Sequence, residues 1–200
     1  ARLVFRGYDF CFTGRTAVQN TGFAIRSGLP YRCGADLTTL SLGESVRRGK
    51  ELVLYPGEAR EMHLLAVHLK SGCPRGPLDS GKPECSKLAQ QAPLLEAWID
   101  EQPRAGHAFA VLGDFNRDLL HEAGPARDAS GAQLNLYAEI NDGEPPDAAL
   151  VNAAADQPFI NCSAAQNFTG YIDNILLGGR LAARRVSGGF ERLTYRTADA

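Results

Sequence analysis

The chain has 200 residues, of which 44% are hydrophobic and 22% are charged, and its formal net charge at pH 7 is −2. A chain of this length buries about 70% of the surface that it exposes when unfolded, so we expect one domain over residues 1–200. The nearly balanced charge excludes the broad positive field that holds non-specific binders on nucleic acid. No run of 18 or more apolar residues occurs, so the sequence predicts no transmembrane segment.

Short apolar or alternating runs, each bounded by Gly, Pro or polar residues, predict a chain rich in strands. In chain order, strands are expected at residues 3–8, 22–25, 37–42, 51–54, 63–69, 108–112, 171–177 and 192–195. Two basic clusters, Arg47 with Arg48 and Lys50 and then Arg184 with Arg185, are expected to form solvated faces.

The clearest helix is predicted over residues 86–102, where apolar residues recur at steps of three and four and form one stripe. A weaker helical pattern covers residues 132–140, and residues 145–166 are too mixed to assign. The strands at 63–69 and 108–112 are almost continuously apolar, which indicates a sheet covered on both faces. The sequence therefore predicts an α/β (α+β) fold with two packed sheets flanked by helices.

Five cysteines are present, and no two have the Cys-x-x-Cys spacing of structural zinc sites and redox dithiols. Cys73 and Cys85 bracket a segment rich in Gly, Pro, Ser and Asp, where a disulfide would stabilise the fold by restricting the unfolded chain. Such a disulfide would place the protein in the periplasm or outside the cell. The alternative is five reduced, buried thiols in the cytoplasm, and the sequence leaves both readings open.

Polar residues stand where the apolar strands end. Asp114 and Asn116 follow the run at 108–112, and a carboxylate beside a carboxamide at a strand end can orient water, a metal ion or a phosphate. We expect both side chains to face one side of the sheet, in strand register, with Phe115 turned to the other. The alternative is a turn, because Asp and Asn are also favoured by loops.

Two further polar residues interrupt apolar strands. His68 closes the run at 64–67, where its imidazole could protonate or hydrogen-bond a phosphoryl oxygen, although a strand-end histidine is more often structural. Asp173 lies among large apolar residues, and burying a carboxylate without a partner costs several kcal/mol. Its partner is a histidine or a metal in a functional site, and a backbone amide or an arginine in a structural one.

Two other phosphate- or metal-site patterns fail here. Asp114-x-Asn116-x-Asp118 matches the first ligands of a calcium-binding EF-hand loop, but Leu119 and Pro125 stand where glycine and glutamate are required. A calcineurin-like metallophosphatase also uses Gly-Asp, but it needs histidine-rich partners. The histidines of this chain are not so placed: they are His63, His68, His107 and His121.

Three motifs occur in a fixed order, with a helix between the first two: Val67-His68-Leu69-Lys70-Ser71, Gly113-Asp114-Phe115-Asn116 and Tyr171-Ile172-Asp173. In this the chain resembles the endonuclease/exonuclease/phosphatase superfamily, which includes pancreatic deoxyribonuclease-like enzymes. The resemblance implies a four-layer αββα sandwich of two mainly antiparallel sheets. It also implies hydrolysis of phosphate esters with Mg2+, or with Mn2+ or Ca2+, as the cofactor.

The resemblance also implies roles for single residues. His68 would activate the phosphate, and Asp114 would align or deprotonate the attacking water. Asn116 would bind the scissile phosphate, and Asp173 would orient the second catalytic histidine of the family. The segment Asn20-Thr21-Gly22-Phe23-Ala24-Ile25-Arg26 is similar to the family's phosphate-contacting strand, so Asn20 is expected to contact a phosphate oxygen.

The chain departs from the family pattern at both ends. The upstream metal-binding Glu and the downstream Ser-Asp-His motif are absent, so the metal ligands stay unassigned, and Asn174 stands where many members have histidine. We therefore expect a domain incomplete at both ends that has little activity by itself, taken from a phosphodiesterase, nuclease or phosphatase. The alternative is a degenerate member that binds a phosphorylated partner without turnover.

The expected partner is a phosphate-ester substrate, either a nucleic acid, a phospholipid headgroup or a small phosphate ester, bound by a monomeric protein. Substrate choice in such folds is set by loops around the rim of the site. The loop of residues 72–85 borders His68, and we expect it to set the substrate preference.

Overall fold

The computed structural model describes residues 6–122, 124–161 and 169–191. The elements in chain order are β1 (Tyr8–Phe12), β2 (Gly22–Arg26), β3 (Tyr31–Leu37), the 3-10 helix η1 (Thr38–Ser41), β4 (Gly49–Leu54), β5 (Met62–His68), α1 (Pro83–Arg104), β6 (Phe109–Asp114), η2 (Leu119–His121), α2 (Leu136–Ile140), β7 (Leu150–Asn152), β8 (Asp173–Gly178) and η3 (Gly179–Arg184).

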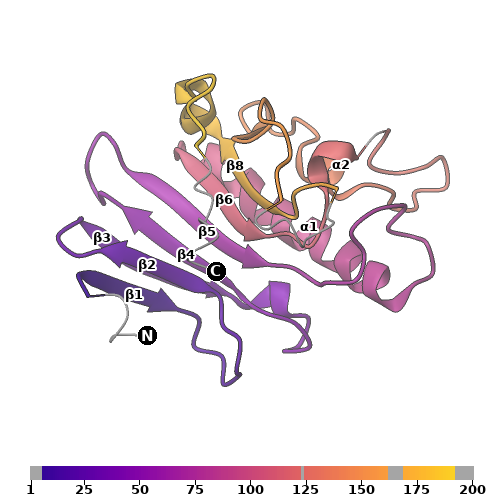
Figure 1. Ribbon diagram of the computed structural model, residues 1–200, viewed down its shortest axis with the longest axis horizontal. Helices are drawn as coiled ribbons and strands as arrows, with labels where there is room; N and C mark the ends of the chain where they lie inside the picture. The colour runs from indigo at the N-terminus through magenta and orange to yellow at the C-terminus, as the bar shows by residue number, and fades with distance from the viewer. Residues whose placement is uncertain (1–5, 123, 162–168, 192–200) are drawn as a thin grey trace.

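Six of the strands form one mixed sheet, in the order β3-β4-β5-β6-β8-β7, while β1 and β2 form a separate antiparallel hairpin. Within the large sheet, β5 and β6 are parallel and the other described pairs are antiparallel. Parallel neighbours need a long crossover, and α1 provides it between β5 and β6. Figure 1 shows this sheet with α1 and α2 grouped beside β5 and β6.

The helix α1 covers one face of the large sheet. It begins at Pro83, where the missing N–H of proline costs no helical hydrogen bond. Its buried stripe packs into the main core together with one face of β5 and β6. The core residues of these three elements include Leu88, Ala92, Leu95 and Ile99 of α1, Leu65 and Val67 of β5, and Phe109 and Val111 of β6.

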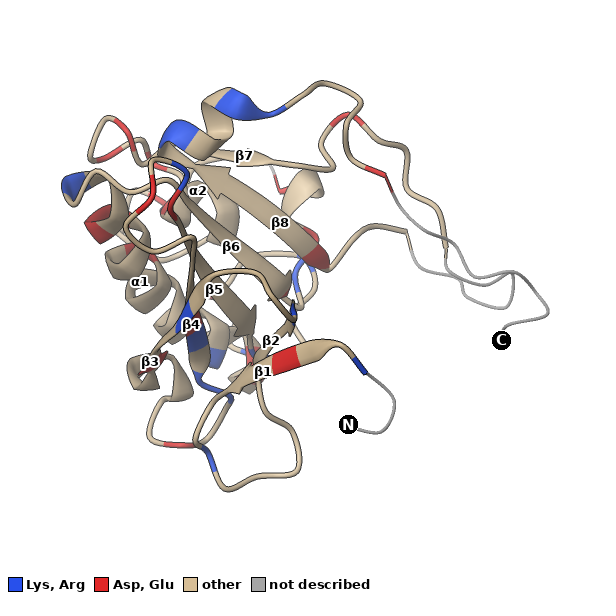
Figure 2. Cartoon of the chain, turned by 90° about the vertical axis from the view of Figure 1, so that its left-hand side faces the viewer, with Lys and Arg blue, Asp and Glu red and all other residues tan. Residues whose placement is uncertain are grey.

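The β1–β2 hairpin covers part of the opposite face. Side chains alternate along a strand, so Leu65 points to α1 while Leu64 points away from it. Leu64 joins a smaller core with Leu52 of β4 and with Cys11 and Ile25 of the hairpin. Figure 2 shows the hairpin and α1 on different sides of the sheet.

The described cysteines are paired in disulfides. Cys73 is bonded to Cys85, which is one of the two readings that the sequence left open. A second disulfide, which the sequence did not predict, joins Cys11 of β1 to Cys33 of β3 and so links the hairpin to the large sheet. Cys162 lies outside the described residues.

The predicted α/β class with two packed sheets and a helical layer is confirmed. Strands predicted at 22–25, 51–54, 63–69 and 108–112 match β2, β4, β5 and β6, and the helix predicted at 86–102 lies inside α1. The helix predicted at 132–140 is shorter in the structure than predicted: α2 covers only the second half of that range. None of the helices in the described part of the chain is long and apolar enough to cross a membrane.

The strand predicted at 37–42 is wrong, because β3 ends at Leu37 and η1 follows. The hydroxyl of Ser41 donates to the Thr38 carbonyl, and such local hydrogen bonds compete with a sheet ladder. Leu40 is buried in the main core from this helical turn. The strand predicted at 192–195 and residues 3–5 of the one predicted at 3–8 lie outside the described residues. The rest of the prediction at 3–8 is wrong except at its last residue, because Arg6 and Gly7 form a turn and β1 begins at Tyr8.

Candidate active site

The register of three neighbouring strands places three polar residues side by side. His68 of β5 pairs with Asp114 of β6, and Asp114 pairs in turn with Asp173 of β8. Val67, one residue before His68, and Leu176, three residues after Asp173, belong to the core on the α1 side. Because side chains alternate, His68, Asp114 and Asp173 all point to the hairpin side of the sheet. We call these three residues the polar row.

His68 and Asp114 are in direct contact within the polar row. Nε2 of His68 lies 3.3 Å from Oδ2 of Asp114, and the two side chains are 32% and 27% exposed, so a substrate can reach both. Burial, and then the charge of Arg47, holds the pKa of His68 below its usual value, although the Asp114 carboxylate acts in the opposite direction. The imidazole is therefore neutral near pH 7 and can donate from one ring nitrogen.

A turn holds Asp114 and Asn116 together. Strand β6 ends at Asp114, and Asn116 has a left-handed φ of 52°. The Asn116 backbone N–H donates to Asp114 Oδ1 at 2.7 Å, and its side-chain Nδ2 donates to the Leu69 carbonyl at 3.0 Å. The expectation that both side chains lie in strand register is therefore wrong, because Asp114 forms the side-chain turn that was the alternative. The turn fixes the Asn116 amide against the end of β5.

Gly113 lets β6 approach β5 closely just before this turn. Its φ is 132°, and a Cβ at this position would lie 2.1 Å from the Val67 carbonyl oxygen. A larger residue would push apart the two strands that carry His68 and Asp114. The glycine of the Gly-Asp motif is thus needed to keep His68 and Asp114 of the polar row close together.

Arg117 anchors the rim loop of residues 72–85 beside the site. It is only 1% exposed. Its Nη1 donates to the Cys73 carbonyl at 3.1 Å, its Nη2 to the Gly76 carbonyl at 2.6 Å, and its Nε to Glu122 Oε1 at 2.6 Å. The loop predicted to set substrate preference is therefore tied to the residue that follows Asn116. Sequence reasoning missed Arg117 because a buried arginine has no local signature.

Arg47 is a second residue that sequence reasoning missed. Its Nη2 donates to Gln19 of the β1–β2 loop, and its buried Nε has no hydrogen-bond partner among the described residues. Lys50 is 8% exposed and lies 2.8 Å from Asp36, so the predicted solvated face at 47–50 is wrong. The signal that could have revealed Arg47 is the antiparallel β4–β5 pair, which sets the start of β4 beside the end of β5.

Asn20 is not joined to the polar row by any contact of the described residues. Its Nδ2 donates to the Ala17 carbonyl at 3.2 Å, and its Oδ1 accepts from the Thr13 hydroxyl at 3.3 Å. Both of its polar groups are thus used inside the β1–β2 loop. The neighbouring Gln19, through Arg47, makes the link from this loop toward His68.

Asn174 does not belong to the polar row. It is 4% exposed, and its Oδ1 accepts from Nδ2 of Asn152 at 2.8 Å. It alternates with Asp173 along β8, so it points to the α1 side of the sheet. Residue 174 therefore does not contribute a side chain to the row, and its being asparagine leaves the composition of the row unchanged.

The ligand types of the row suit a hard divalent cation. Asp114, Asp173 and Asn116 offer the oxygen donors that Mg2+ prefers, and Mg2+ often uses only one or two carboxylates together with water and substrate phosphate. Among the described residues, however, three His, Cys, Asp or Glu ligands converge only at Glu61, His63 and His107. The described part of the row thus supplies suitable donors without completing a three-ligand site.

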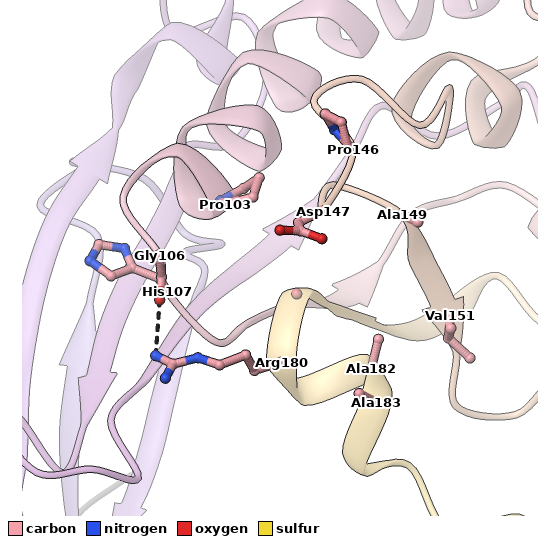
Figure 3. A pocket seen from close by; sticks show the side chains of 11 residues that line it. Pro103, Gly106, His107, Pro146, Asp147, Ala149, Val151, Arg180, Ala182 and Ala183 are labelled. Carbon is pink, nitrogen blue, oxygen red and sulfur yellow. Dashed lines mark hydrogen bonds between the residues drawn. The ribbon is translucent and has the colours of Figure 1, made fainter.

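One cavity lies near the site, and a second cavity lies far from it. A cavity of about 350 Å³ borders the rim loop and is lined by Arg75, Arg117, Asp118 and His121 among others. Arg75 and His121 both contact the buried Asp118 carboxylate. A larger cavity of about 490 Å³ lies at the other end of the sheet, where Arg180 donates to the Gly106 carbonyl at 2.9 Å (Figure 3). The larger cavity therefore does not coincide with the polar row.

Comparison with known families and with curated protein sequences gives no match. Solved structures do match. Truncated TDP2 of Caenorhabditis elegans is 12% identical with a TM-score of 0.51, over 88% of this chain and 64% of that one. The 3′ phosphatase NExo of Neisseria, bound to a product DNA hairpin, is 15% identical with a TM-score of 0.54, over 88% of this chain and 69% of that one.

The catalytic domain of Xenopus laevis APE2 is 17% identical with a TM-score of 0.53, over 90% of this chain and 68% of that one. The chain spans 64% of truncated TDP2 and 48% of a second TDP2 structure from C. elegans, so it is shorter than these neighbours. The shared sandwich is the fold that the three sequence motifs implied.

Proposed function

We propose that this chain, which has the fold of the endonuclease/exonuclease/phosphatase superfamily, carries the central part of the active site of a phosphoric ester hydrolase. The observation that carries the proposal is the polar row, in which His68, Asp114 and Asp173 stand on adjacent strands and point to one side of the sheet. One neighbour in fold is a 3′ phosphatase bound to a DNA hairpin, which supports the reaction class.

Asp114 is the base in this proposal. Its carboxylate is held at Oδ1 by the Asn116 N–H, and its Oδ2 lies 3.3 Å from Nε2 of His68. A carboxylate fixed in this way can orient a water molecule and accept its proton as the oxygen attacks phosphorus. General base catalysis of this kind contributes about 10²- to 10⁴-fold to the rate.

His68 and Arg47 stabilise the negative charge of the transition state. The single N–H of the neutral imidazole can be donated to a phosphoryl oxygen, and the nearby guanidinium of Arg47 adds a positive charge. A phosphoryl transition state spreads negative charge over its oxygens, so donors positioned in advance lower its energy. Asn116 is proposed as a further contact to the phosphate, and so is Asn20, whose amide nitrogen has a second N–H besides the one donated to Ala17.

A divalent cation is part of the proposal, with Mg2+ first and Mn2+ or Ca2+ as alternatives. Asp173 and the Asn116 side-chain oxygen would hold it together with water and substrate phosphate, which leaves Asp114 as the base, and the cation would neutralise charge on the phosphate ester. The proposed substrates are nucleic acids, phospholipid headgroups and small phosphate esters, acted on by a monomer. The two disulfides favour an oxidising compartment, so we propose a periplasmic or secreted protein over a cytoplasmic one.

The test is hydrolysis of a generic phosphodiester, bis-p-nitrophenyl phosphate, and of the monoester p-nitrophenyl phosphate, by this chain and by the natural protein that contains it, called the parent protein below. Each assay is run with Mg2+, Mn2+, Ca2+ or a chelator. We expect metal-dependent turnover of at least one substrate by the parent protein. We also expect Asp114→Asn to lower kcat by about 10²- to 10⁴-fold.

Asp128→Asn is the matched control. Asp128 Oδ1 accepts the backbone N–H of Ser130 at 2.7 Å, in the same kind of side-chain turn as Asp114, but on an exposed loop. It should leave turnover unchanged. Absence of metal-dependent turnover with both substrates would contradict the proposed hydrolase activity.

A second candidate function is binding of a phosphorylated partner without turnover. It is favoured by the incomplete ligand set of the polar row among the described residues. In that case calorimetry would show that the parent protein binds a phosphate ester, that Arg47→Gln weakens the binding, and that no product forms.

A further inference from the structure

A cluster of one glutamate and two histidines lies at the end of the large sheet that is remote from the polar row. His63 is the second residue of β5 and His68 the last, so the two are about 16 Å apart along the strand. They also point to opposite faces. Glu61 lies just before β5, and His107 lies between α1 and β6. The cluster therefore joins the β4–β5 turn to the α1–β6 turn.

The potential ligand atoms of this cluster are already gathered. One atom each from Glu61, His63 and His107 lies within 4.8 Å of the others. His63 Nε2 is 2.9 Å from Glu61 Oε1, and the His63 and His107 rings stack with their centroids 3.5 Å apart. Two ligands of a tetrahedral zinc ion stand about 3.3 Å apart, so small side-chain rotations suffice to bring all three onto one ion.

The hydrogen bonds of Gln102 settle which nitrogen of His107 carries the proton. Gln102 is 6% exposed, and its Nε2 donates to the Trp98 carbonyl at 3.1 Å. Its Oε1 lies 3.0 Å from His107 Nδ1 and can only accept there, so Nδ1 carries the hydrogen. The lone pair of His107 Nε2 is therefore available to a metal, which is the arrangement that outer partners impose on metal-binding histidines.

The other two ligands are also oriented. Glu61 Oε2 accepts the backbone N–H of Gly57, which turns Oε1 toward His63. A metal would replace the proton on His63 Nε2, and the imidazole can carry that proton on Nδ1 instead. The side chains of His63 and Glu61 are 17% and 30% exposed, so an ion can enter from solvent. The charges that act on His107 from outside the cluster, Arg180 and Glu101, have opposite signs and shift its pKa in opposite directions.

We propose that Glu61, His63 and His107 form a binding site for a divalent transition-metal ion, with Zn2+ as the preferred ion and water in the fourth coordination position. Two imidazoles and one carboxylate suit Zn2+, whereas Mg2+ prefers oxygen donors alone. The site is separate from the polar row and does not depend on the proposed hydrolase activity. The bound ion clamps together the two turns at this end of the sheet.

The test uses the whole chain after treatment with a chelator, titrated with Zn2+ by calorimetry and with Co2+ by visible absorption. We expect one Zn2+ per chain with a Kd below about 10 μM, the Co2+ spectrum of a four-coordinate site, and a rise in Tm with Zn2+. An excess of Mg2+ should not displace the ion. No saturable binding of Zn2+ by the unmodified chain would overturn the proposal.

His107→Phe keeps a stacked ring but removes a ligand, and it should weaken Zn2+ binding at least tenfold. His121→Phe is the matched control, because His121 is 58% exposed at another site, and it should bind as the unmodified chain does. Equal affinity in the His107 variant would mean that the ion binds elsewhere and would overturn the proposal.

If the His107 variant fails to fold, Gln102→Leu decides, since it leaves all three ligands in place. A 10- to 100-fold loss of affinity supports the site, and unchanged affinity contradicts it. The Asp114→Asn variant should bind Zn2+ normally, which separates this site from the polar row.

Discussion

His68 Nε2 lies 3.3 Å from Asp114 Oδ2, across a pair of residues in register on the parallel strands β5 and β6. This contact makes the two side chains one functional unit. The parallel pairing arises because α1 returns the chain to the same end of the sheet before β6 begins.

Because His68 and Asp114 act as a unit, we expect the effects of their substitutions on catalysis to be non-additive. We expect His68→Gln and Asp114→Asn each to lower kcat of the parent protein by about 10²- to 10⁴-fold. The double variant should lose little more than the worse single variant, since either change disables the pair. The measurement is kcat for all four forms with the better of the two synthetic substrates. Multiplicative losses would show that the residues act independently.

Arg47 is expected to control the protonation of His68. Its positive charge disfavours the imidazolium, so Arg47→Gln should raise the pKa of His68, and Asp114→Asn should lower it. An NMR titration of the His68 ring protons measures both shifts. Arg32→Gln, on the exposed strand β3, is the control and should leave the titration unchanged. A His68 pKa unaffected by Arg47→Gln would mean that the guanidinium is too well screened to act.

Arg117 is expected to be a large contributor to stability. Arg117→Met leaves the Glu122 carboxylate, whose side chain is 6% exposed, without its cation and should cost about 3–5 kcal/mol. Urea unfolding measures this loss. The control is Arg104→Met, where the side chain is 55% exposed and 3.3 Å from Asp100, with an expected cost under about 0.5 kcal/mol. Similar costs for the two variants would refute the anchoring role of Arg117.

Glu96 is expected to make stability depend on pH. Burial, followed by the charges of Glu139 and Asp142, raises its pKa to about 7. A pKa that is higher in the folded state means that the protonated form stabilises the fold, fully below about pH 4.5 and progressively less as the pH rises through about 7.

Glu96→Gln should therefore raise Tm at pH 8 by about 2–4 °C, the change that about 1 kcal/mol produces in a domain of this size, after allowance for solvent screening. At pH 5 the variant and the unmodified chain should have nearly equal Tm. Glu101→Gln, on the exposed side of α1, should change neither value. A constant difference between pH 5 and pH 8 would count against this account.

The sequence predicts the positions of the polar row well, because each of its members interrupts or ends an apolar run. An interruption of that kind is a local signal, and the run around it fixes which face the side chain takes. The long helix between β5 and β6 is equally local, since its stripe repeats over residues 86–102.

The parts that could not be predicted depend on contacts between distant segments. Strand β3 is an edge strand with a mostly exposed, polar pattern, so it has no apolar run to reveal it. Arg47 and Arg117 act through the ends of long side chains, whose reach depends on the path of two loops. The Glu61, His63 and His107 cluster forms only when the starts of β5 and β6 are set side by side.

The disulfide between Cys11 and Cys33 bears on the loop that reaches the active site. Cys11 lies in β1 near the start of this loop, which carries Gln19, the partner of Arg47. The backbone of residues 27–30 already joins β2 to β3, and the disulfide adds a second covalent link that keeps the hairpin, and with it Gln19, near Arg47. When the small apolar contact between the hairpin and β4 opens, the loop thus stays close enough to re-form its contact with Arg47. In a reducing compartment the same loop would be held only by noncovalent contacts, among them those of Gly14 with Asp36 and of Arg15 with Glu44.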